Sequence, residues 1–242
     1  MDMIASLFRK PATAAILSLI GVIAFYVVIG GVDLAQLFNA ASWVNYAARI
    51  GIVAIPVGLL MISGEIDISI GAMIPAGAMT TAIISGYYEL PMIFAVLGAL
   101  AIGVIVGTIN GVLAVRTTVP TLIITLATLV AMQGIVLAGS KLLTGSASVP
   151  LNAPDWAKTV FGHLMFGGSH QVVIVWWVII AAVFWFVMHK TKYGNWIFAI
   201  GGDRQSARNA GIPVDGITIL LFILTATSAS FEIGRASCRE RV

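Results

Sequence analysis

Two short polar segments interrupt this apolar chain, and their charged side chains are the first candidates for chemistry. One segment, MISGEIDISIGAM at residues 61–73, carries the acidic residues Glu65 and Asp67. The other, IGGDRQSARNAGIPVDG at residues 200–216, holds two arginines and two aspartates between long uncharged runs. What these two segments contact is therefore the main question about function.

No arrangement of catalytic residues accompanies these segments. The three histidines, His163, His170 and His189, lack the HxxxH and HExxH spacings of metal sites. The chain also lacks the G-x-x-x-x-G-K-[ST] loop that binds ATP and the GxSxG turn of serine hydrolases. We therefore expect no catalytic site, no metal and no cofactor in this chain.

The composition places the chain in a membrane. Hydrophobic residues make up 60% of it and charged residues 10%, against about a quarter charged in a soluble domain. Residues 11–32, 90–115 and 117–140 contain no Asp, Glu, Lys or Arg, and each run exceeds the roughly 20 residues that a helix needs to cross a bilayer. No basic run with interleaved aromatic residues marks a nucleic-acid surface. We predict an all-α, polytopic bundle of transmembrane helices.

About six complete spans and a truncated seventh follow from the apolar runs. Pro91 and Pro120 open two of the helices, where a missing backbone N–H costs nothing. Residues 33–46, with Trp43 and Tyr46, are predicted to form a short interfacial helix, because such aromatic side chains favour the headgroup level. The spanning helices are expected at about 12–31, 47–63, 69–86, 92–115, 121–139 and 171–189, with the seventh beginning at about 216.

The native chain is predicted to end at Phe231. The last eleven residues, EIGRASCRERV at 232–242, carry five charges directly after an apolar run, and they resemble the translation of a common sequencing adapter. We expect this tail to be non-native. It contains Cys238, the only cysteine of the chain, so the rest has no thiol for a disulfide or a cysteine metal site.

The basic residues predict the orientation. With a cytoplasmic N-terminus, more Lys and Arg residues lie inside than outside, as the positive-inside rule requires. The loop 190–215 then faces the cytoplasm. The inside residues are Arg9, Lys10, Arg116, Lys190, Lys192, Arg204 and Arg208, and the outside ones are Arg49, Lys141 and Lys158.

A stripe of small residues predicts close helix packing. Gly103, Gly107 and Gly111 recur every four residues on one face of the fourth helix. Such a stripe lets the backbone of another helix approach closely. Packing inside the bundle is favoured over a contact between two copies of the chain.

The segment 61–73 has two open interpretations. As a polar tip between two helices, it uses Ser63 and Ser69 as caps. As a broken helix beside a permeation path, it turns its acidic side chains toward a cavity or partner, because a charge at mid-membrane costs about 2.5–3.5 kcal/mol. Four uncharged polar residues in the later helices indicate either hydrogen bonds between helices or a passage for a neutral polyol. They are Asn110, Thr125, Thr128 and Gln133.

The segment 200–216 is predicted to form a short helix. Asp203 is placed as its N-cap, Gly211 follows its end, and Pro213 prevents its continuation. Asp203 at the start and Arg208 near the end both suit the helix dipole. A docking surface for another protein explains this design better than a solvated loop.

Three stretches together resemble the inner-membrane permease subunits of simple-sugar ABC importers, of the ribose, xylose, arabinose and galactoside type. ISGEIDISIGAM is similar to the family's acidic Gly-x-Ile-Asp-x-Ser-x-Gly motif, although Glu65 stands where the family usually has Gly. GTINGVLAVRTTVPTLIITLATL is similar to its Asn-Gly helix and the following Thr-rich helix. YGNWIFAIGGDRQSARNAGIPVD is similar to its cytoplasmic loop. The resemblance covers nearly all of residues 10–231, within a predicted permease domain 1–231.

The resemblance implies a division of labour between subunits. The loop 190–215 carries a coupling helix that docks on a separate ATP-binding subunit, which holds ATP and Mg²⁺. A periplasmic sugar-binding protein delivers the sugar, a second permease copy joins the first, and the dimer works by alternating access in the bacterial inner membrane. The implied coupling residues are Gly201, Gly202, Asp203, Ala207, Arg208, Gly211 and Ile212. The implied translocation-path residues are Ser63, Gly64, Glu65, Asp67, Ser69, Gly71, Asn110, Thr125 and Thr128.

Two other classes of protein stay open. A secondary transporter or channel that works without ATP is expected to carry titratable residues inside its bundle and no docking helix. A membrane scaffold is expected to bind something other than an ATPase through residues 200–216.

Overall fold

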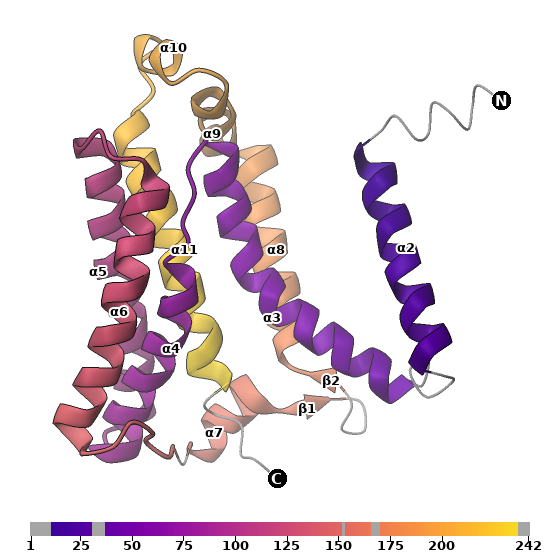
Figure 1. Cartoon of the computed structure of the whole chain (residues 1–242), viewed down its shortest axis with the longest axis vertical. Coiled ribbons are helices and arrows are strands. Elements are labelled where there is room, and N and C mark those ends of the chain that lie inside the picture. The colour runs from indigo at the N-terminus through magenta and orange to yellow at the C-terminus, as the bar shows by residue number, and fades with distance from the viewer. Residues whose placement is uncertain (1–10, 31–36, 152, 166–169, 237–242) are drawn as a thin grey trace. The chain divides into compact units, whose positions relative to one another are not determined.

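The structure is a computed structural model of the whole chain, and it describes residues 11–30, 37–151, 153–165 and 170–236 (Figure 1). Nearly all of these residues are helical. The chain divides into two compact units, residues 1–46 and 47–242.

The smaller unit contains α2, Pro11–Gly30, and the start of α3, Leu37–Ile62. The side chains of α2 are exposed from Ile16 to Ile29, and a helix that is apolar on every side is suited to lipid. The predicted separate helix at 33–46 is wrong. From Leu37 onward these residues form the first turns of α3, because no Gly or Pro interrupts the helix before Gly51.

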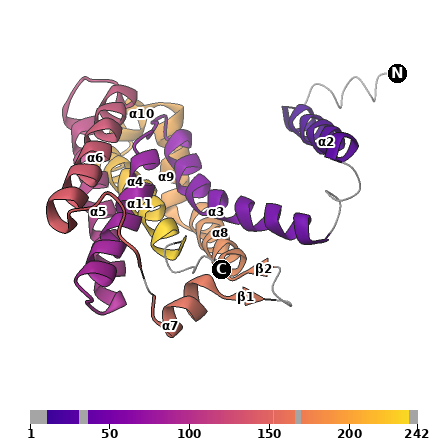
Figure 2. The same ribbon diagram turned by 60° about the horizontal axis from the view of Figure 1, so that its bottom comes forward.

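The larger unit is a helix bundle organised around α11. This helix packs along α5 and α4, and α4 also contacts α6. Figures 1 and 2 show α11 with α4, α5 and α6 on one side and α8 and α9 on the other. The bounds are α4 Ile70–Thr81, η2 Ala82–Tyr87, α5 Met92–Arg116, α6 Thr121–Thr144, α8 Val173–Lys190, α9 Lys192–Gly202, α10 Arg204–Asn209 and α11 Val214–Ala236.

Six helices of the described chain are long and apolar enough to cross a membrane. The prediction of an all-α polytopic bundle is therefore confirmed. The seventh long helix in chain order, α11, begins two residues earlier than predicted and continues to Ala236; residues 237–242 lie outside the described part, and the non-native tail stays a prediction. The six candidate spans are Ala41–Ile62, Ile70–Tyr87, Met92–Arg116, Thr121–Thr144, Val173–Lys190 and Val214–Glu232.

Two connections carry structure that the sequence patterns did not predict. Between α6 and α8 lie α7, Asp155–Ala157, the π-helix η3, Lys158–Gly162, and two short antiparallel strands, β1 at Leu164–Met165 and β2 at His170–Gln171. The helix α9 was also missed, because Gly194, Gly201 and Gly202 disfavour a helix by propensity. Close packing overrides that preference, since a Cβ at Gly194 would overlap the backbone of Met188.

The predicted glycine stripe packs inside the bundle, as expected. Each of its three glycines meets the backbone of α11 in an antiparallel register. An added Cβ would lie 2.6 Å from the Cα of Thr227 at Gly103, 2.6 Å from the Cα of Ile223 at Gly107, and 2.8 Å from the Cα of Ile219 at Gly111. Real Cβ contacts are not this short, so α5 and α11 are in contact at backbone distance.

We expect Gly107→Ala to lower the free energy of unfolding by about 1–3 kcal/mol, because the new methyl group overpacks the α5–α11 contact. Gly134→Ala in α6 is the matched control, since no atom lies within 4 Å of its Cβ position. Alanine there improves helix propensity by roughly 1 kcal/mol. Thermal unfolding in detergent measures both variants, and equal melting temperatures would contradict the packing.

Candidate functional site

The segment between α3 and α4 is a break within the bundle. α3 ends at Ile62, α4 begins at Ile70, and the connection runs back along the helices toward the middle of the bundle (Figure 1). Gly64 has a φ of +88°, and the N–H of Glu65 donates to the carbonyl of Leu60 at 3.1 Å, as in a glycine-terminated helix end. Of the two interpretations of segment 61–73, the structure supports the broken helix.

A chain of hydrogen bonds joins this break to three helices. Asp67 accepts from the N–H of Ser69 at 2.8 Å, from its hydroxyl at 2.6 Å, and from the hydroxyl of Thr225 on α11 at 3.0 Å. The amide of Asn110 on α5 donates to the hydroxyl oxygen of Ser69 at 3.0 Å. The hydroxyl of Thr128 on α6 donates to the amide oxygen of Asn110 at 2.6 Å. We call these five residues the polar network.

The polar network is shielded from solvent by the bundle. Asp67 is 3% exposed, and Ser69, Asn110 and Thr225 are fully buried. A buried carboxylate is costly unless hydrogen bonds compensate for its lost hydration. Here both oxygens of Asp67 accept hydrogen bonds, so the network satisfies its own acid and holds the break against α5, α6 and α11.

The other acid of the break pairs with the segment before α11. Glu65 is 8% exposed, and its carboxylate lies 2.6 Å from a guanidinium nitrogen of Arg204. A second guanidinium nitrogen of Arg204 donates to the hydroxyl of Thr218 on α11 at 2.9 Å. Arg204 is the first residue of α10, so this ion pair connects the break directly to that short helix.

The short helix in segment 200–216 forms as predicted. Asp203 is the N-cap of α10, and its carboxylate accepts from the N–H of Ser206 at 2.6 Å. Hydrogen bonds from Ser206 hold the pKa of Asp203 below its usual range. At the other end Gly211 has a φ of +82°, and the N–H of Ile212 donates to the carbonyl of Ala207 at 3.1 Å. This is the αL glycine termination of a helix.

One side of α10 is anchored and the rest is exposed. Ala207 is 3% exposed and belongs to the core at this end of the bundle. Gln205, Ser206, Arg208 and Asn209 are exposed, and Arg208 forms an ion pair with Asp215 of α11. The helix therefore presents a polar, partly cationic face at the end of the bundle.

The remaining predicted residues lie near the network without joining it. The hydroxyl of Ser63 donates to the carbonyl of Leu60 at 2.7 Å, which caps the end of α3. Within the described part of the chain, Thr125 bonds only to carbonyls of its own helix, those of Thr121 and Leu122, and Gly71 lies against Leu129. Ser69 does not cap α4 with its side chain, because its hydroxyl donates to Asp67 instead. That these residues line a translocation path stays a prediction.

The sequence patterns did not reveal three residues that contribute to the site at the break. Arg204, Thr218 and Thr225 hold the two acids of the break. The two threonines are seven residues apart, so they share one face of α11. That spacing is a signal the sequence does contain, although it does not tell which acids the threonines face.

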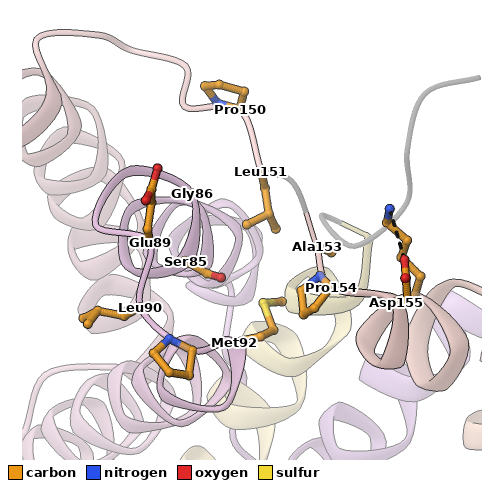
Figure 3. A pocket seen from close by; sticks show the side chains of 12 residues that line it. Ser85, Gly86, Glu89, Leu90, Met92, Pro150, Leu151, Ala153, Pro154 and Asp155 are labelled. Carbon is orange, nitrogen blue, oxygen red and sulfur yellow. Dashed lines mark ion pairs between the residues drawn. The ribbon is translucent and has the colours of Figure 1, made fainter.

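A cavity lies at the opposite end of the bundle from α10. Its volume is about 1100 Å³, and Figure 3 shows Glu89 and Asp155 contributed by the two connections that flank it. Asp155 also pairs with Lys158 at 3.9 Å. The lining residues are Ser85, Gly86, Glu89, Leu90, Pro91, Met92, Pro150, Leu151, Ala153, Pro154, Asp155 and Lys158.

Comparison with known proteins identifies one family. Residues 39–231 match the family described as branched-chain amino acid transport system, permease component. This match covers both acids of the break, the polar network and α10.

Curated relatives carry related descriptions. The chain is 32% identical over 187 residues to the galactofuranose transporter permease protein YtfT of Escherichia coli (strain K12), covering 77% of this chain and 52% of the relative. It is 28% identical over 227 residues to the fructose import permease protein FrcC of Rhizobium meliloti, covering 90% of this chain and 61% of the relative. It is 33% identical over 183 residues to the autoinducer 2 import system permease protein LsrD of Enterobacter sp. (strain 638), covering 75% of this chain and 55% of the relative.

The chain thus spans between about half and three fifths of the length of these curated relatives. No solved structure matches it significantly.

Proposed function

Since the chain belongs to the family of permease components of branched-chain amino acid transport systems, we propose that it is the membrane-spanning permease subunit of an ATP-driven importer. The single observation that carries this function is α10, a capped helix with an exposed polar face at one end of the bundle. ATP and Mg²⁺ bind to a separate subunit, and α10 docks on it. The chain itself provides the passage and the coupling, and it catalyses no bond chemistry.

The proposed orientation places α10 in the cytoplasm and the chain in the bacterial inner membrane. Among the described residues, Arg116, Lys190, Lys192, Arg204 and Arg208 lie at the α10 end, because α5 runs antiparallel to α11 there. Lys141 and Lys158 lie toward the other end. Basic residues concentrate on the cytoplasmic side of membrane proteins, so α10 faces the cytoplasm and the cavity at the other end faces the periplasm. A crossing of the membrane by α2 then places the N-terminus in the cytoplasm.

The proposed substrate is a small neutral sugar. The names of the relatives YtfT and FrcC give galactofuranose and fructose. The polar side chains at the middle of this bundle are hydroxyls, an amide and one carboxylate that is already hydrogen-bonded. Such groups suit sugar hydroxyls, and none of these residues of the polar network supplies a positive charge for the carboxylate of an amino acid.

The partners follow from the same proposal. A periplasmic sugar-binding protein delivers the substrate at the end that carries the cavity, and a second permease copy completes the transporter. Exposed apolar side chains on α6 and α8, such as Leu126, Val130, Val178 and Val183, are available for lipid or for that second copy.

The proposal predicts that Arg208→Glu abolishes co-purification of the permease with its ATP-binding subunit. The variant reverses the charge on the exposed face of α10 and places two carboxylates together, since Arg208 pairs with Asp215. Asp215→Asn is the matched control, because it removes the ion pair while leaving Arg208 on the surface. Both variants are scored for permease content of the membrane fraction and for bound ATPase.

We expect normal permease content in both variants and loss of the ATPase only in Arg208→Glu. Wild-type recovery of the ATPase with Arg208→Glu would refute the assignment of α10 as the docking helix. Failure of the wild-type permease to bind any ATP-binding subunit would refute the proposed function itself.

A further inference from the structure

The end of α3, the end of α9, α10 and the start of α11 share one small core. Its buried side chains are those of Leu59, Leu60, Ile197, Ile200, Ala207, Val214, Ile217, Leu221 and Phe222. A Cβ at Gly201 would overlap the carbonyl oxygen of Ile62, the last residue of α3. The segment that leads into α10 therefore rests directly on the point where α3 stops.

The ion pair between Glu65 and Arg204 lies just beyond this contact. Glu65 is almost fully buried, while the side chain of Arg204 is 38% exposed. Removing Arg204 would leave the buried carboxylate of Glu65 without its counter-charge, so the pair favours the observed register of the break against α10. The Nε of Arg204 is buried and has no hydrogen-bond partner among the described residues.

Two positions along α11, Thr218 and Thr225, hold the break in place by hydrogen bonds. Thr218 accepts from Arg204 and thereby holds the Glu65 end, while Thr225 donates to Asp67. Seven helical residues separate the two threonines, a rise of about 10 Å along α11. The break therefore leads from α10 at the end of the bundle to the polar network in its middle.

The break is also the part of this region best able to change shape. Residues 65–69 contain no helix, and Gly64 supplies a left-handed backbone at their start, whereas α11 is one continuous helix of 23 residues. Hinges are formed by such element ends, which absorb backbone rotation.

From this arrangement we propose that Glu65 and Arg204 are positioning residues that join α10 and the α3–α4 break into one moving unit. When α10 is displaced by its partner, Arg204 carries Glu65 with it, and the break passes the movement to Asp67 and the polar network. The network then shifts relative to α5 and α6, which it joins through Asn110 and Thr128. This inference rests on the proposed function, and it assigns a transmission route that the docking face alone does not define.

The test uses the importer assembled from the full permease, its ATP-binding subunit and its binding protein in proteoliposomes. Glu65→Gln and Arg204→Gln are compared with wild type for bound ATPase, ATP hydrolysed and sugar taken up. We expect the ATPase to remain bound and to hydrolyse ATP, while uptake per ATP falls roughly three- to thirtyfold, the range found for residues that transmit coupling. The reciprocal double variant Glu65→Arg with Arg204→Glu restores part of the uptake, because it rebuilds the pair.

A cross-link tests the same proposal by replacing the ion pair with a covalent bridge. Glu65→Cys and Arg204→Cys are combined with Cys238→Ser and joined by a flexible bifunctional thiol reagent. The unlinked double-cysteine variant lacks the ion pair, so we expect it to have low uptake. If the two elements move as one unit, the cross-link restores that uptake. Uptake blocked by the cross-link and recovered on cleavage of the reagent would show that they separate, which overturns the inference.

Unchanged uptake per ATP in both single variants also overturns the inference, and it leaves the proposed function intact as long as the ATPase is bound. Absence of any bound ATPase in the wild-type assembly is the failure of the proposed function, so the two failures are distinguishable.

Discussion

Asp67→Ala will lower the free energy of unfolding by about 3 kcal/mol or more, because it leaves buried hydrogen-bond donors without an acceptor. The carboxylate accepts from the N–H and the hydroxyl of Ser69 and from the hydroxyl of Thr225. The hydroxyl of Thr225 keeps a second acceptor, the carbonyl of Phe222. The two donors of Ser69 have no second acceptor among the described residues, and Ser69 is fully buried.

Titration with a denaturing detergent measures this loss of stability. Thr225→Val is the matched control, since it removes the hydroxyl that Asp67 and the carbonyl of Phe222 share, at nearly constant volume, and it is expected to cost about 1 kcal/mol. Asp67→Asn keeps the shape and one carbonyl acceptor, so its effect falls between the two. If Asp67→Ala unfolds at the same detergent concentration as wild type, the polar network does not hold the break in place.

Gly201→Ala and Gly202→Ala will differ sharply although they are neighbours at the end of α9. A methyl group at Gly201 overlaps the carbonyl oxygen of Ile62, whereas no atom lies within 4 Å of a Cβ at Gly202. Backbone atoms must move to accommodate the first variant, at a cost of about 1–3 kcal/mol. That cost corresponds to roughly 5- to 150-fold in any equilibrium that depends on this contact.

Sugar uptake by the assembled importer is the readout for this pair. We expect Gly201→Ala to lose most of its uptake and Gly202→Ala to match wild type, at equal permease content in the membrane. Equal uptake by the two variants would mean that the contact between α9 and α3 has no part in coupling.

Regular apolar runs made most of this fold predictable. The boundaries of α5 and α6 follow from Pro91 and Pro120 and from uninterrupted apolar sequence, and the structure places both helices within a few residues of the prediction. Asp203 and Gly211 predicted the two ends of α10 for the same reason, since capping depends on local geometry. Local rules sufficed where the stabilising contacts lie close together in the sequence.

The site was less predictable, because its contacts join distant parts of the chain. Asp67 and Thr225 are 158 residues apart, and Asn110 and Ser69 are 41 apart. The sequence identified both acids of the break as unusual without indicating which groups compensate them. Only the folded structure shows that Thr225 bonds to Asp67 and that Thr218 bonds to Arg204, the partner of Glu65.

The missed helix α9 and the wrong prediction of a separate helix at 33–46 have a similar origin. Three glycines make α9 a weak helix by propensity, yet they allow its backbone to lie against Met188 and Ile62. Trp43 and Tyr46 predicted an interfacial helix from composition alone, but an unbroken helical sequence continues through them into α3.

Site-specific photo-cross-linking tests the central claim most directly, namely that α10 is where this permease meets its ATPase. A photoreactive amino acid replaces Gln205 on the exposed face of α10 or Ser148 at the opposite end of the bundle; both positions are exposed. After irradiation of native membranes, mass spectrometry identifies the attached protein. We predict an adduct with an ATP-binding subunit from position 205 and none from position 148. The account is contradicted if position 205 forms no such adduct, or if both positions form it equally.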